Sequence, residues 1–111
     1  MVDKLDRNQT VFTYGRGDQP EVVLVGSDMD NFFVGFFIGG ILLLPGASPR
    51  ALLPALRFGI EKAKALGYGR LEMGILDAHP DARGLSALAK RLGFKPYDCD
   101  DTQVFYRLEL Q

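Results

Sequence analysis

The sequence is 111 residues long, 47% apolar and 24% charged, a composition typical of an ordered globular protein with one core. We therefore expect a single domain over residues 1–111. Thirteen basic and fourteen acidic residues give a formal charge of −1, so no overall positive field would attract nucleic acid or anionic lipid. The longest apolar stretch, Phe32–Leu44, is interrupted by glycines and falls short of the roughly 20 residues that span a bilayer, which favours buried sheet.

Cysteine usage and the N-terminal sequence favour a cytoplasmic protein. The single cysteine, Cys99, cannot form an internal disulfide, and the first ten residues lack the apolar run of a signal peptide. The oxygen-bearing residues Asp28, Asp30 and Asn31 lack the spacing and the glutamate of a calcium loop. We expect no metal site.

Short strands are predicted in the first quarter of the chain. Val11–Tyr14 alternates apolar and polar residues before the turn sequence Gly15–Pro20. Glu21–Val25 is a β-branched run, and Gly26–Asn31 has the residues of a loop. These strands and a third one predict an antiparallel meander.

The apolar stretch that follows is long for one strand. Its double glycine, Gly39-Gly40, fits either a tight turn or a bulge. We favour two strands, Phe32–Ile38 and Ile41–Leu44.

The pattern then changes to that of a helix. Apolar residues recur at spacings of three and four, which predicts one buried helical face; they are Leu52, Leu53, Leu56, Ile60, Ala63 and Leu66. Pro54 would break a helix interior, so regular helix should begin close to Leu53, after an irregular or 3₁₀ segment at Ser48-Pro49. Gly67 suits the left-handed position after the helix end.

The last third predicts strand, helix and strand. Arg70–Leu76 is an apolar strand, and Asp77 or Asp81 can cap the next helix, which Gly93 ends. The buried face of that helix is predicted to carry Leu85, Leu88, Ala89 and Leu92. Gln103–Leu110 alternates as a closing strand with one buried face.

Sheet strands followed by helix, strand, helix and strand predict an α+β (mixed α/β) domain. With Leu-Gly-Tyr68 after the first helix and Leu-Gly-Phe94 after the second, this order resembles the GNAT superfamily of N-acetyltransferases over about the last two-thirds of the chain. More narrowly, Leu43-Leu-Pro-Gly46 followed by Pro49-Arg-Ala51 resembles short phage-type members. The resemblance implies a GNAT-like, mostly antiparallel sheet with two packed helices. Because only about ten residues precede Val11, the helices that wall the acceptor site in typical members are expected to be missing, an N-terminally truncated form.

The resemblance implies acetyl-CoA as the acyl donor. A loop at a helix N-terminus would hold its pyrophosphate through free amides; the matching positions are Ala47, Ser48, Arg50, Ala51 and Leu52. The preceding strand end, at Leu42 and Leu44, would hold the pantetheine arm through main-chain groups. The loop departs from the family pattern because no glycine follows Gly46.

The chemistry departs from the family pattern as well. Many members carry an asparagine and a proton-donating tyrosine on the second helix, at positions that are Ala82 and Ala89 here. Glu72 and His79 are the catalytic candidates that remain. For Glu72 an exposed strand face is the stronger expectation, and for His79 an ordinary loop position.

Two functions follow from the resemblance. The first is transfer of an acetyl group from acetyl-CoA, or binding of CoA, with an unknown amine or protein acceptor. The second is a catalytically degenerate GNAT-fold binding or virion-associated protein without transferase activity. Asp98, Asp100 and Asp101 are expected to form a solvated acidic loop. The aromatic cluster of Phe32, Phe33, Phe36 and Phe37 could supply either core or the interface of a homodimer.

Overall fold

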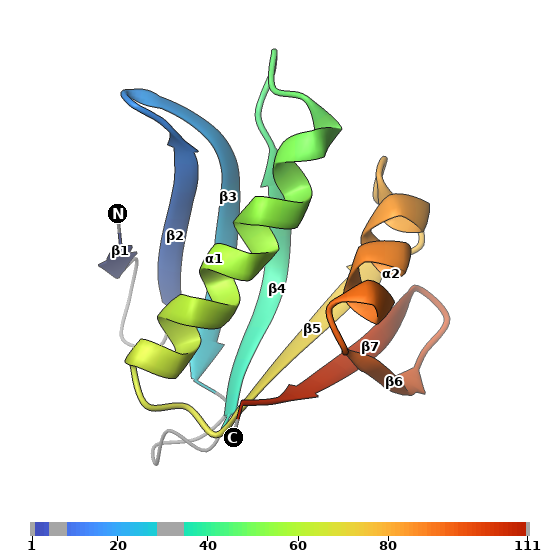
Figure 1. Cartoon of the computed structure of the whole chain (residues 1–111). Coiled ribbons are helices and arrows are strands. Elements are labelled where there is room, and N and C mark those ends of the chain that lie inside the picture. The colour runs from blue at the N-terminus through green and yellow to red at the C-terminus, as the bar shows by residue number, and fades with distance from the viewer. Residues whose placement is uncertain (1, 5–8, 29–34, 111) are drawn as a thin grey trace.

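Among the residues that the structure describes, seven strands form one sheet in the order β1-β2-β3-β4-β5-β7-β6, with two α-helices packed on it (Figure 1). The computed structural model describes residues 2–4, 9–28 and 35–110. Its elements are β1 (Val2–Lys4), β2 (Gln9–Arg16), β3 (Gln19–Asp28), β4 (Gly35–Leu43), a 3₁₀ turn (Pro49–Ala51), α1 (Leu52–Ala65), β5 (Arg70–Leu76), α2 (Ala82–Arg91), β6 (Lys95–Cys99) and β7 (Gln103–Glu109). Every neighbouring pair is antiparallel except β4 with β5. The expected α+β fold, with a mostly antiparallel sheet and two helices, is confirmed.

Both helices lie over the same face of the sheet. Figure 1 shows α1 crossing β2, β3 and β4, while α2 lies over the β5 and β7 side. The core fills the layer between sheet and helices, and its fully buried side chains include Phe12, Leu24, Phe36, Leu71 and Leu85. In the part of the chain that the structure describes, the opposite face of the sheet carries no helix.

The β2–β3 hairpin and its antiparallel pairing with β4 confirm the predicted meander. Both hairpin strands are longer than predicted. β3 continues to Asp28, so residues 26–28 belong to a strand, and their prediction as part of a loop was wrong. Asp30 and Asn31 lie outside the described residues, as do Phe32 and Phe33.

Strand β4 is a single strand with a bulge, so the prediction of two strands was wrong. Its pairing with β3 steps from Gly40 opposite Val25 to Ile38 opposite Gly26, which leaves Gly39 without a partner. An extra residue of this kind bends a strand and increases its twist. The double glycine is therefore a bend within β4.

The helices begin and end where the sequence predicts. The chain makes a 3₁₀ turn after Ser48, and regular helix starts at Leu52, one residue from the predicted start. Gly67 and Gly93 follow the two helix ends with φ of 92° and 98°, the left-handed conformation that glycine adopts without strain. Asp81 occupies the N-cap position of α2, although its side chain makes no capping hydrogen bond.

The strands on either side of α2 are partly as predicted. β5 has the predicted bounds, and β7 lies within the predicted closing strand. The edge strands β1 and β6 were not predicted. All five residues of β6 are exposed and one of them is Pro96, so the segment shows neither apolar alternation nor a strand-like composition.

Gly26 and Gly84 provide a matched test of the packing at the bulge. A Cβ at Gly26 would lie 2.4 Å from Phe36 Cε2 and 2.8 Å from the Phe37 carbonyl oxygen, so Gly26→Ala should lower the free energy of unfolding by about 1–3 kcal/mol. Gly84 lies in α2 with no heavy atom within 4 Å of its ideal Cβ, so Gly84→Ala should raise that energy by about 0.5–1 kcal/mol. Urea unfolding measures both. Equal effects from the two variants would contradict the packing described for β3 and β4.

Candidate active site

The sheet splits between its two central strands. β4 and β5 pair in parallel over four residue pairs, from Gly35 with Arg70 to Ile38 with Met73. Beyond these pairs β4 continues along β3, while β5 continues along β7 through all seven of its residues. Figure 1 shows the two strands diverging toward the end of β4. We call the unpaired stretch, residues 39–43 of β4 and 74–76 of β5, the split.

The β3–β4 ladder shows which main-chain groups of β4 face the split. The Leu44 amide donates to Glu21 O on β3 at 2.9 Å, so Leu44 and, by alternation, Leu42 direct their main-chain groups toward β3. Ile41 and Leu43 therefore direct theirs into the split. The main-chain groups predicted at Leu42 and Leu44 to hold the pantetheine arm therefore point toward β3, and those of the neighbouring Ile41 and Leu43 face the split instead.

The other side of the split follows from the β5–β7 ladder. The Asp77 amide donates to Thr102 O at 2.8 Å, which places Asp77 and alternate residues before it in hydrogen-bonded pairs with β7. The main-chain groups of Gly74 and Leu76 consequently face β4. Two strand edges thus face each other across the split. On the β5 side the Leu76 carbonyl already accepts a hydrogen bond from the His79 amide at 3.0 Å.

The loop between β4 and α1 follows the open end of β4 and is partly closed by its own hydrogen bonds. Ser48 Oγ accepts from the Arg50 amide at 3.2 Å, and Ser48 O accepts from the Ala51 amide at 2.9 Å. The Leu52 amide donates to Pro49 O. Three amides predicted to bind phosphate are therefore already engaged within the loop.

Other groups of this loop remain accessible. The Ala47 amide donates to Leu44 O, whereas among the described residues the amides of Gly46 and Ser48 have no protein partner. The Arg50 side chain is exposed, while Ala51 and Leu52 are buried in the core. The first turn of α1 contains no acidic residue. An anion at this helix end would meet two free amides and one guanidinium.

His79 reaches across the split. Its Nε2 lies 2.6 Å from Ile41 O, and its Nδ1 accepts from the Asp81 amide at 2.9 Å. Because an amide nitrogen can only donate, Nδ1 carries no proton, and Nε2–H donates to the Ile41 carbonyl. His79 is a loop residue, as predicted, but it connects the β5–α2 loop to β4.

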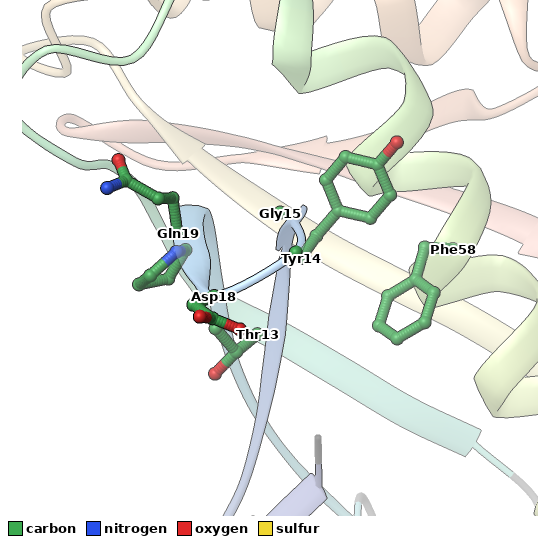
Figure 2. Close-up of a pocket in the computed structure, with 8 residues that line it drawn as sticks. Thr13, Tyr14, Gly15, Asp18, Gln19 and Phe58 are labelled. Carbon is green, nitrogen blue, oxygen red and sulfur yellow. The ribbon is translucent and has the colours of Figure 1, made fainter.

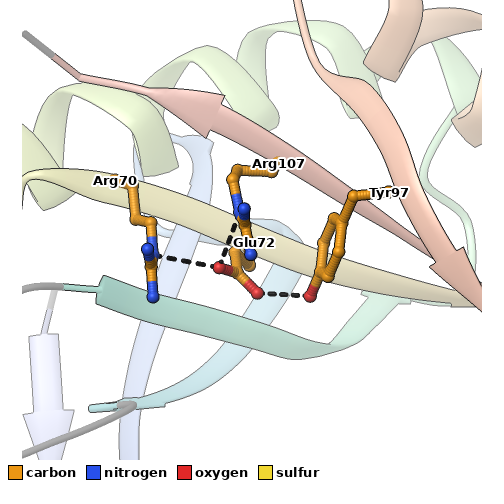
Figure 3. Close-up of polar contacts among 4 residues, drawn as sticks. All are labelled: Arg70, Glu72, Tyr97 and Arg107. Atoms are coloured by element: carbon orange, nitrogen blue, oxygen red, sulfur yellow. Dashed lines mark hydrogen bonds and ion pairs between the residues drawn. The ribbon is translucent and has the colours of Figure 1, made fainter.

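Glu72 lies on the helix-free face just before the split, opposite Phe37 of β4. Its side chain is 1% exposed, so the expectation of an exposed strand face was wrong. Oε1 accepts a hydrogen bond from the Tyr97 hydroxyl, and Oε2 accepts one from Arg107 Nε at 2.9 Å (Figure 3). Arg70 Nε lies 3.0 Å from Oε2 as an ion pair, without directing its N–H at that oxygen. Three strands, β5, β6 and β7, thus meet at one carboxylate.

The same cluster changes the acidity of Tyr97. Although Tyr97 is 41% exposed as a whole, desolvation of its hydroxyl raises the pKa of Tyr97 from 10.0 to about 12, and the hydrogen bond to Glu72 and its negative charge act in the same direction. The Arg107 guanidinium lies 4.2 Å from the centroid of the Tyr97 ring and opposes the rise in pKa. Tyr97 is therefore a neutral hydrogen-bond donor at physiological pH.

No protein-family model matches this sequence, and no curated protein matches it at a significant level. Solved structures match it closely in three dimensions. A GNAT family acetyltransferase from Elizabethkingia anophelis with acetyl-CoA bound aligns with 93% of this chain and 77% of its own, at 16% identity and a TM-score of 0.75. The IAA acetyltransferase from Bacillus cereus aligns with 93% of this chain and 79% of its own, at 16% identity and a TM-score of 0.75. An acetyltransferase from Bacillus subtilis in complex with CoA gives 94% and 78% coverage, 20% identity and a TM-score of 0.74.

The chain has the GNAT fold. Identities of 16% and 20% do not transfer residue roles, so the likeness establishes the architecture. In this GNAT fold, α2 has no side-chain proton donor at positions 82 and 89, which are both alanine. Ala82 is half-buried, and Ala89 is fully buried in the core.

Aromatic rings cover the helix-free face beside the split. Phe105 of β7 lies between Phe37 of β4 and Tyr97 of β6, with centroid distances of 6.2 Å to each. Gly74 of β5 makes room for this arrangement, since a Cβ there would lie 3.3 Å from both phenylalanine rings. A hollow of about 460 Å³ adjoins Phe37 at the bulge; it is lined by Val25, Gly26, Ser27, Phe37, Gly39 and Gly40.

A second pocket, of about 490 Å³, lies at the β2–β3 hairpin and is separate from the split. Figure 2 shows the Tyr14 ring directed toward α1 beside Phe58, and their centroids are 5.7 Å apart. The remaining lining comes mainly from hairpin residues such as Asp18 and Gln19. We assign this pocket to hairpin packing.

The β6–β7 loop is an acidic turn held together by Asp100. Asp100 Oδ1 accepts from the Thr102 amide, the Thr102 hydroxyl and the Gln103 amide, and the bonds from Thr102 lower the pKa of Asp100. Cys99 is exposed. Within the described residues, no group of three or more His, Cys, Asp or Glu side chains is placed to hold a metal ion. No helix in the same residues has the length and apolar character needed to cross a membrane.

Removing the charge of Glu72 tests whether this carboxylate holds together the cluster that it forms with Arg70, Tyr97 and Arg107. Glu72→Gln should lower the free energy of unfolding by about 1–3 kcal/mol. The loss is limited because the side chains of Arg70 and Arg107 are 31% and 37% exposed and partly screened by solvent. Glu61→Gln is the control, since Glu61 forms an exposed pair with Lys64 at 3.7 Å and should change the energy by less than about 0.5 kcal/mol. An unchanged urea midpoint for Glu72→Gln would rule out the role.

The titration of Tyr97 tests the same contacts independently. Since the folded-state pKa is raised, the stability linked to Tyr97 is fully present below pH 10 and lost as the pH rises toward about 12. Glu72→Gln should lower the Tyr97 pKa toward 10.0 and weaken this dependence. Tyrosinate absorbance, with Tyr97→Phe subtracted to isolate one of four tyrosines, measures the pKa. The same Tyr97 transition in both backgrounds would show that Glu72 does not act on it.

Proposed function

We propose that this protein transfers an acetyl group from acetyl-CoA to an amine. The observation that carries the proposal is the split, where two strand edges that do not pair with each other lie next to the N-terminal loop of α1. Support also comes from the fold, because solved structures that share it are acetyltransferases with acetyl-CoA or CoA bound.

The strand edges fit the pantetheine arm, which is an extended chain with two amide groups. Such a chain pairs with an open strand edge as another strand does, through main-chain N–H and C=O groups. Ile41 and Leu43 direct these groups into the split on β4, where the Ile41 carbonyl accepts from the His79 ring. Gly74 and Leu76 face them on β5, where the Leu76 carbonyl already accepts from the His79 amide. We assign the arm to the split between these residues.

The loop fits the diphosphate through fewer groups than the sequence predicted. The free amides of Gly46 and Ser48 and the exposed guanidinium of Arg50 are available to an anion. The amides of Ala51 and Leu52 would have to leave their bonds within the 3₁₀ turn. We therefore infer a site that binds CoA through Arg50 more than through a glycine-rich cradle; Ala47 lies beside it.

Acetyl-CoA supplies an activated thioester, and this chain would contribute mainly orientation and a polar strand edge. The amine would approach from the helix-free face, where Glu72 and the hollow at the bulge lie beside the split. Glu72 is buried and both of its oxygens accept hydrogen bonds, so an amine could reach the carboxylate only if the side chains around it moved. The acceptor is an amine of a small molecule or of a protein.

A GNAT-fold binding module without transferase activity is the second candidate. Specific observations favour it: the carboxylate of Glu72 is enclosed by three partners, three loop amides are engaged, and Ala89 is buried where many members place a tyrosine. Such a module would have kept the sheet and lost the donor site.

Other expectations stay predictions beside this proposal. A homodimer would cover the helix-free face of the sheet and complete a wall for the acceptor. A phage-type origin and a cytoplasmic location follow from the sequence resemblance and from cysteine usage. Analytical ultracentrifugation measures the first of these directly.

Titration with acetyl-CoA and CoA tests the proposed function. Each should bind by calorimetry and raise the unfolding midpoint, with a stabilisation of about 2.7 kcal/mol at one hundred times Kd. Arg50→Ala should weaken binding about five- to tenfold through the loss of one charge-assisted contact. Arg57→Ala is the control, because Arg57 is exposed farther along α1. Absence of binding at millimolar CoA would favour the module without a donor site.

A further inference from the structure

His79 connects the two sides of the split where no ladder joins them. It comes from the loop after β5, and its imidazole donates to the main chain of β4 at Ile41, with a nitrogen–oxygen distance of 2.6 Å. The Asp81 amide fixes the opposite ring nitrogen as an acceptor. The ring is therefore held in one tautomer and one orientation by two main-chain contacts on different elements.

The Ile41 carbonyl is one of the acceptors that the open edge of β4 would offer to an added strand. The other residues of this edge that lie nearest, Gly40 and Leu42, direct their main-chain groups toward β3. A chain laid along β4 would place an amide N–H against Ile41 O. The imidazole reaches that oxygen from the far side of the split, so it lies across the path of such a chain.

We propose that the pantetheine arm of CoA replaces His79 at the Ile41 carbonyl, by exchanging the imidazole N–H for an amide N–H of the arm. The inference rests on the proposed function and assigns His79 a positioning role in it. In the free protein the imidazole satisfies a half-buried carbonyl, which would be costly to leave without a donor. A thioester without an amide N–H cannot make the exchange, so His79 selects for pantetheine-type donors.

If the exchange occurs, His79→Ala should raise the affinity for CoA, whereas loss of a side chain from a binding site usually lowers it. Because the variant removes a competitor for Ile41 O, CoA should bind about two- to tenfold more tightly than to the unmodified protein. The nucleotide part of CoA alone, 3′-phospho-ADP, has no pantetheine arm and should bind both proteins equally. Arg83→Ala, an exposed side chain in the first turn of α2, should leave both affinities unchanged.

Isothermal calorimetry of the full chain with CoA and with 3′-phospho-ADP separates the possible outcomes. The exchange is supported if His79→Ala binds CoA more tightly than the unmodified protein does and binds 3′-phospho-ADP equally. If His79→Ala binds CoA equally or more weakly than the unmodified protein does, the exchange is overturned and the proposed function stands. An equal gain in affinity for CoA and 3′-phospho-ADP has the same consequence. Failure of both proteins to bind CoA overturns the proposed function and the exchange together.

The unmodified protein provides a measurement that does not depend on a variant. His79 is the single histidine of the chain, so its ring signals in long-range proton–nitrogen NMR spectra need no assignment. The free protein should show a proton on Nε2 and an acceptor at Nδ1. Saturation with CoA should shift the Nε2 signal strongly, as its hydrogen bond to Ile41 O is lost. Ring signals that stay unchanged while calorimetry shows CoA bound would overturn the exchange.

Discussion

The end of the β4–β5 pairing is the constraint on which the rest of the structure depends. Two strands that start in parallel register can separate only if each keeps a full ladder on its other side, and β3 and β7 provide those ladders. The bulge at Gly39 bends β4 immediately after the last paired residue, Ile38. Separation leaves main-chain groups without partners inside the sheet, and such groups need a donor or an acceptor from elsewhere. The split therefore creates a need for a ligand or for a side chain that takes its place.

The two halves of the divided sheet share one core. α1 covers β2, β3 and β4 and also contacts β5, α2 packs on β5, and the buried side chains of all these elements belong to one cluster. On the opposite face, Glu72 ties β5 to β6 and β7 through Tyr97 and Arg107. The contact between Phe37 and Phe105 then joins the halves at the point where they part. These interactions hold the two halves together beside the paired residues of β4 and β5, and beyond them the two strands diverge.

The sequence predicts features that depend on neighbouring residues and misses those that join distant ones. The spacing of apolar residues, Pro54 and the glycines after both helices set the helix bounds correctly, because helices form from local contacts. Gly39-Gly40 fits a turn and a bulge equally well, and only the register with β3 decides between them. β6 is exposed along its whole length, so no apolar alternation marks it.

The candidate site shows the same limit more strongly. The end of β4 and the start of α1, which flank the loop, were predicted to within one residue because such boundaries have local signals in the sequence. Glu72 was expected on an exposed face, since its partners Tyr97 and Arg107 lie 25 and 35 positions away and are brought to it by the ladders of β6 and β7. The contact of His79 with Ile41 spans 38 positions and depends on the split itself.

A site built from main-chain groups leaves little trace in a sequence. Any residue except proline at Ile41, Leu43, Gly74 or Leu76 has the same main-chain N–H and C=O groups, provided that the strands diverge at the same place. What must be maintained is the bulge, the two outer ladders and a helix that begins after β4, and many sequences satisfy these conditions. Alanine can therefore stand at positions 82 and 89 without any change in the split. Binding along the strand edges can accordingly outlast the side chains that perform proton transfer, which is why donor binding and acyl transfer are separable questions for this chain.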